Sequence, residues 1–132
     1  MLIAPIPPHG HAAHDLRSAY VEQVWLPVLG PTSVALLRAC PLLWAIAAPY
    51  EADDQDIAHM LGLGGGSRLR DVCKRLARFR VANWDPTTGS LQVRTHLPDL
   101  TATQLARCPE HTRGLHCATS QARPAHEPTP TS

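Results

Sequence analysis

The sequence has no long apolar run, and this absence excludes a membrane-spanning helix, which needs about 20 apolar residues. The first residues also lack the charged region and hydrophobic stretch of a signal peptide. There is no CxxC pair among the four cysteines, which argues against a zinc knuckle. We therefore expect a cytoplasmic protein, without a membrane partner, whose thiols stay reduced.

Signatures of catalysis and of nucleotide binding are also missing. No serine or cysteine nucleophile is paired with a positioned base, and the adjacent carboxylates Asp53 and Asp54 read as exposed. The glycines Gly64–Gly66 are not followed by the lysine of a phosphate loop. They follow a helix-forming segment, whereas a dinucleotide loop follows a strand. We expect neither an enzyme nor a bound cofactor.

Composition divides the 132 residues into three parts. Residues 1–17 are rich in Pro, His and Gly and show no lasting periodicity, and residues 117–132 are polar and Pro-rich. Both ends are predicted to be disordered tails. Residues 18–116 remain for one small domain.

Apolar spacing predicts mostly helices in that domain. Residues 18–29 form an amphipathic helix that Pro27 kinks or ends, and residues 31–48 form a buried helix in which Pro41 is a candidate break. A short acidic helix then ends at Gly62, and a longer basic helix over 68–80 carries one apolar stripe. The period then changes to two around the turn "DPTTGS", which predicts a β-hairpin over 81–97, and Thr101 can cap a short helix after it.

The glycine-rich segment between the acidic and the basic helix is best explained as a tight turn. Gly62 can take the left-handed conformation that ends a helix, and Leu63 can then pack inward. Gly64–Gly66 let the chain reverse before Ser67 caps the next helix. A flexible linker does not explain the two flanking helices, because each is too short to be stable alone. The segment predicts a helix-turn-helix.

"DIAHMLGLGGGSRLRDVCKRLARFRVA", with the hairpin "GSLQVRTHLP" behind it, resembles the winged helix-turn-helix DNA-binding proteins of bacteria over about residues 54–97. "VWLPVLGPTSVALLRA" resembles the first helices of such domains in actinobacterial regulators, and also those of bacterial replication-initiation proteins. The resemblance implies a mainly α winged helix-turn-helix fold with a small β-hairpin. The turn is wider here than in that family, so the resemblance does not fix the angle of the basic helix.

The basic helix is charged on one side. Within residues 68–80 six cations accompany Asp71 alone, a local net charge of +5 in a chain whose net charge is +1. In the family such a helix enters the major groove of double-stranded DNA. The resemblance implies that five residues contact bases: Ser67, Arg68, Arg70, Asp71 and Lys74. It implies that Arg75 and Arg78 contact phosphates. Arg94, on the hairpin, would contact the DNA backbone or the minor groove. The expected function is sequence-specific DNA binding by a transcriptional regulator.

Three alternatives stay open. Winged helices also serve as protein–protein adaptors, for example in replication or mobile-element control, and the acidic segment 51–56 could meet a partner or the basic helix itself. A homodimer through residues 18–29 is plausible as well. The segment "CPEHTRGLHC" carries zinc-ligand residues, but the adjacency of the last two makes a tetrahedral site awkward, so we expect no metal: Cys108, His111, His116 and Cys117.

Overall fold

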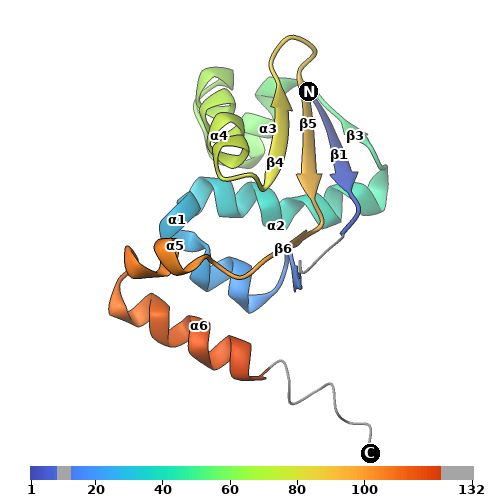
Figure 1. Ribbon diagram of the computed structural model, residues 1–132. Coiled ribbons are helices and arrows are strands. Elements are labelled where there is room, and N and C mark those ends of the chain that lie inside the picture. The colour runs from blue at the N-terminus through green and yellow to red at the C-terminus, as the bar shows by residue number, and fades with distance from the viewer. Residues whose placement is uncertain (9–12, 123–132) are drawn as a thin grey trace, which may run out of the picture.

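The computed structural model describes residues 1–8 and 13–122. Figure 1 shows a mixed α/β arrangement, in which helix α2 (Pro31–Ile46) lies against a small sheet and α4 (Gly66–Arg78) flanks the hairpin. Helix α6 (Glu110–Ala122) lies at the end of the molecule farthest from the hairpin tip. No helix in these residues is both long enough and apolar enough to cross a membrane.

The sheet contains more than the expected hairpin. Its strand order is β3-β1-β5-β4, and the inner strand β1 (Leu2–Ile6) runs parallel to β5 (Ser90–Arg94) along its whole length. On its other side β1 pairs antiparallel with the short strand β3 (Tyr50–Glu51). The hairpin strand β4 (Ala82–Asp85) forms the other edge.

The expectation of a disordered tail over residues 1–17 is therefore wrong for residues 1–8 and 13–17. Ile3 in β1 and Leu16 are fully buried, and strand β2 (His14–Asp15) pairs with β6 (His96–Leu97). Segments this short show no measurable period, and the prolines around them resemble a linker. Their order comes from strands late in the sequence. Residues 9–12 lie outside the described part of the chain.

The first expected helix is interrupted at Trp25, two residues before Pro27, which lies in the first turn of the next helix and does not end it. Residues 18–29 contain a π-helical turn, η1 (Tyr20–Val24), followed by the short helix α1 (Leu26–Leu29). The Trp25 N–H reaches back to the Tyr20 carbonyl, so the helix is already widened before the proline. Pro41 likewise does not split α2, which runs unbroken from Pro31 to Ile46.

The turn between α3 (Asp54–Met60) and α4 forms as expected in two respects. Gly62 has a φ of +75°, and the Leu63 N–H donates to the Ala58 carbonyl at 2.8 Å while the Leu63 side chain packs on the core. The predicted Ser67 cap is wrong. Helix α4 begins one residue before it, because Gly65 has an extended backbone and occupies the N-cap position without a side-chain cap.

The core joins α4 to the hairpin and to the first helices. The predicted stripe of α4 faces inward, with Phe79 half-buried and the rest buried: Leu69, Val72, Cys73 and Leu76. After the hairpin, Thr101 and Gln104 form the capping box of α5 (Ala102–Ala106). Helix α6 runs past the expected domain end at residue 116. The C-terminal tail expected over 117–132 is therefore helical up to Ala122, and residues 123–132 lie outside the described part.

Candidate nucleic-acid interface

The outward side of α4 carries a large excess of positive charge. All seven residues predicted there are solvent-exposed, and we call them the basic face: Ser67, Arg68, Arg70, Asp71, Lys74, Arg75 and Arg78. The exposure follows from the helical period, because the apolar stripe occupies the opposite side and packs on the core. The structure thus brings these residues together on a single rigid element.

The cations of the basic face have no acidic partner in the part of the protein that the structure describes. In residues 1–8 and 13–122 no ion pair joins them to Asp71 or to the acidic segment 51–56. In the described residues there is thus no ion pair by which the acidic segment would neutralise the basic helix. Solvent ions or a bound polyanion must therefore screen the repulsion between these cations.

Arg75 differs from its neighbours because it is held against the protein. Its Nη2 donates to the Val28 carbonyl at 2.8 Å, and its guanidinium carbon lies 5.7 Å from the centre of the Phe79 ring. This arginine therefore links α4 to α1. Arg78, one turn further along, forms no hydrogen bond in the described residues.

Arg94 lies apart from the other predicted residues. It is half-buried at the end of β5 remote from the hairpin tip, and its backbone N–H donates to the Val81 carbonyl at 3.1 Å. The tip itself carries the exposed Thr87 and Thr88. If the hairpin touches a ligand with its tip, Arg94 does not take part.

A groove of about 500 Å³ adjoins the basic face, and sequence reasoning did not anticipate it. One wall is the beginning of α2, with Gly30, Thr32 and Ser33, and the other is α4, with Lys74 and Arg78. The bend at Gly30, whose φ is +88°, turns the start of α2 toward α4. A Gly-Pro step flags such a bend in a sequence, but it does not say which helix the bend will face.

The four residues considered for zinc are not gathered into a site. Cys108 is buried and its thiol donates to the Gln104 carbonyl at 3.2 Å, whereas Cys117 is exposed. His116 Nδ1 is hydrogen-bonded to the Tyr20 hydroxyl at 2.7 Å. Within the described residues no three His, Cys, Asp or Glu side chains lie close enough together to hold a metal ion.

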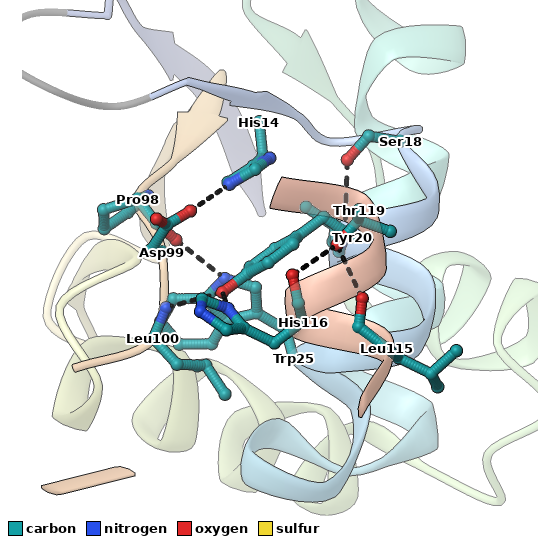
Figure 2. Close-up of polar contacts among 11 residues, drawn as sticks. His14, Ser18, Tyr20, Trp25, Pro98, Asp99, Leu100, Leu115, His116 and Thr119 are labelled. Carbon is teal, nitrogen blue, oxygen red and sulfur yellow. Dashed lines mark hydrogen bonds and ion pairs between the residues drawn. The ribbon is translucent and has the colours of Figure 1, made fainter. Parts of the chain in front are cut away.

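His116 belongs instead to a polar network that the sequence did not reveal. Figure 2 shows Tyr20 at its centre: its ring stacks on His14 with centroids 3.8 Å apart, and its hydroxyl accepts the Leu100 N–H at 2.9 Å. His14 Nε2 in turn meets Asp99 Oδ1 at 2.5 Å. The network joins β2, η1, α6 and the segment after β6, so we assign it a structural role.

Two other buried groups are inert thiols. Burial raises the pKa of Cys40 to about 12, and the neighbouring Cys73 adds to the effect. Burial, and then the nearby Asp54 carboxylate, raise the pKa of Cys73 to about 12 as well. Both therefore remain protonated at neutral pH and make poor nucleophiles or metal ligands.

Comparison with known proteins gives a fold and no family. No family model matches the chain, and no curated protein matches it. Among solved structures it is similar to residues 1–300 of the primosome protein DnaB from Geobacillus stearothermophilus, with a TM-score of 0.50 and 14% sequence identity. The alignment covers 91% of this chain and 48% of that one, so this chain spans about half of its length. The two chains share a fold over that half.

Proposed function

We propose that this protein is a winged helix-turn-helix domain that binds double-stranded DNA through α4 and the hairpin β4–β5. The observation that carries the proposal is the basic face, whose cations are exposed on one helix and have no acidic partner within the described residues. The element order supports it: α2, the short strand β3, α3, a tight turn, α4 and a hairpin follow one another, which is the layout of that family. The primosome protein that shares the fold adds support for a role connected with DNA.

The dimensions of α4 suit a DNA groove. Thirteen residues span about 20 Å, and the major groove, about 12 Å wide, admits one helix. In this arrangement the first turn, with Ser67, Arg68 and Arg70, lies nearest the bases, and Asp71 and Lys74 follow one turn on. Arg78 contacts a phosphate. Arg75 contributes charge but keeps its bond to Val28, and Arg94 stays at the margin.

A second candidate is a protein-interaction module in a replication assembly. It is favoured by the primosome neighbour together with two apolar side chains one turn apart on α2, Leu42 and Ile46, which are 62% and 75% exposed. Such side chains suit a protein partner better than a nucleic acid. Regulation of transcription and action at a replication origin both remain compatible with DNA binding by α4.

Fluorescence-anisotropy titration of a random DNA duplex at several salt concentrations tests the first candidate. The wild type is expected to bind with a steep salt dependence. Lys74→Ala/Arg78→Ala should flatten the logarithmic slope by about 0.9 for each phosphate contact that is lost. Selection of bound duplexes from a random pool then tests sequence specificity.

The matched control removes two exposed cations elsewhere, with Arg17→Ala/Arg113→Ala. This variant has the same net charge as the double variant of α4, so it should retain the wild-type slope. Equal slopes for the two double variants would assign any binding to overall charge and contradict a role for the basic face. Absence of binding at low salt would favour the interaction module.

A further inference from the structure

The groove beside the basic face contains the start of a long helix that the protein leaves uncapped. Helix α2 has sixteen residues, its N-cap Gly30 offers no side chain, and its first turn contains no acidic residue. The backbone N–H groups of Thr32 and Ser33 lie in that first turn, where no intrahelical carbonyl is available to them. The partial positive charge of the helix end is thus open to the groove.

Ser33 provides an independent sign of a ligand at this helix end. It lines the groove and is only 2% exposed, yet its hydroxyl forms no hydrogen bond within residues 1–8 and 13–122. This nearly buried hydroxyl keeps a small solvent-accessible surface, and its hydrogen-bonding capacity is unused within the described residues. An acceptor atom placed in the groove would satisfy it.

The opposite wall of the groove has the same sign of charge. Lys74 and Arg78 line it from α4 together with Arg75, and Asp71 is the one acidic residue lining the groove. Cations that face a positive helix end repel it unless an anion lies between them. Space for an anion exists, since a Cβ added at Gly30 would meet no atom within 4 Å.

We propose that this groove is a phosphate-binding site, in which the Thr32 and Ser33 N–H groups and the Ser33 hydroxyl hold the oxygens while Lys74 and Arg78 neutralise the charge. Donors of these kinds bind phosphate at helix ends generally. The phosphate belongs either to a DNA backbone or to a free phosphate compound. The DNA form rests on the proposed function, because it places one backbone phosphate beside α4, whereas the free form does not.

The test is a titration of the full ¹⁵N-labelled chain with inorganic phosphate at constant ionic strength, followed by NMR. Saturable shifts are expected at the amides of Thr32 and Ser33. Arg78→Ala should weaken phosphate binding about tenfold, and Ser33→Ala several-fold. Arg68→Ala, which removes an exposed cation of the basic face outside the groove, should change the affinity less than about twofold.

A further variant adds an anion to the site itself. Thr32→Glu places a carboxylate in the first turn of α2, where it should abolish the phosphate response and raise the melting temperature. The proposal is overturned if the NMR signals of all the arginines shift in proportion to the phosphate concentration, without saturation. It is also overturned if Ser33→Ala leaves the phosphate titration unchanged, or if Thr32→Glu lowers the melting temperature without weakening phosphate binding.

A competition experiment with duplex DNA separates the two sources of phosphate. Displacement of bound phosphate by the duplex supports the DNA backbone as ligand, and supports the proposed function as well. Saturable phosphate binding with no response to duplex supports a free phosphate compound, so the site stands and DNA binding fails. Salt-dependent duplex binding by α4, with no shift at Thr32 or Ser33 from either duplex or inorganic phosphate, overturns the site while DNA binding stands.

Discussion

The Tyr20 hydroxyl lies 2.7 Å from Nδ1 of His116, and this contact joins α6 to η1, although the two residues are 96 positions apart in the sequence. The same oxygen accepts the buried Leu100 N–H at 2.9 Å. One phenolic group therefore joins three segments (Figure 2).

Tyr20→Phe should lower the free energy of unfolding by about 1–3 kcal/mol, because the Leu100 N–H loses its acceptor while it stays buried. Urea unfolding measures the loss, and amide exchange should become faster in α6. The control is Tyr50→Phe, since the Tyr50 hydroxyl forms no hydrogen bond in the described residues. Equal stabilities of the two variants would contradict the assigned role of Tyr20.

Ile3→Ala should cost about 2–5 kcal/mol, because it opens a cavity in the fully buried centre of the sheet. Leu2→Ala changes the neighbouring, half-buried side chain in the same strand and should cost clearly less. Chemical unfolding of both variants checks the difference. If residues 1–8 were a disordered tail, both substitutions would be neutral.

The three tryptophans should respond differently to replacement by phenylalanine. Trp25 and Trp44 donate their indole N–H to the carbonyls of Pro98 and Ile3, at 3.0 and 3.1 Å, whereas the buried indole N–H of Trp84 has no acceptor in the described part of the chain. Trp84→Phe should therefore be better tolerated than Trp25→Phe by at least about 1 kcal/mol. Thermal unfolding of the single variants would reveal the opposite order if the indole of Trp84 had a polar role.

Thiol reactivity should distinguish the exposed Cys117 from the buried Cys40 and Cys73. At pH 8 a disulfide reagent should modify the exposed Cys117 rapidly and the buried Cys40 and Cys73 only after unfolding. The pKa of each buried thiol is raised from 9.0 to about 12, so the folded state retains the proton. Above pH 9 the thiols of the unfolded chain lose their protons while those of the folded chain keep them, which favours unfolding. The contribution of the two thiols to the free energy of unfolding is therefore complete below pH 9 and is lost as the pH rises toward 12. Rapid modification of all thiols in the native protein would contradict the burial.

The helices around the turn could be predicted because their signals are local. The stripe of α4 repeats over thirteen residues, and Gly62 ends α3 with a conformation that other residues rarely adopt. The solvent exposure of the basic face could be predicted from the same helical period, because its residues lie opposite the apolar stripe. These features depend on residues within a few turns of one another.

What could not be predicted depends on distant partners. Strand β1 has only five residues, one of them a proline, and its order comes from β5, which lies far from it in the sequence. The groove depends on how the bend at Gly30 orients α2 against α4. The tyrosine network likewise joins residues 14, 20, 99 and 116. A local sequence pattern does not predict contacts between residues this far apart in the sequence.

The parallel pairing of β1 with β5 also sets an order of events during synthesis. Leu2 pairs with Ser90, so β1 leaves the ribosome well before β5, its parallel partner and the last strand of this sheet in the sequence. Helices α2, α3 and α4 can associate earlier, because their contacts are local and close small loops. We therefore expect closure of the sheet by β1 to be a late step of folding, before which the edge of β5 is open to pairing with another strand.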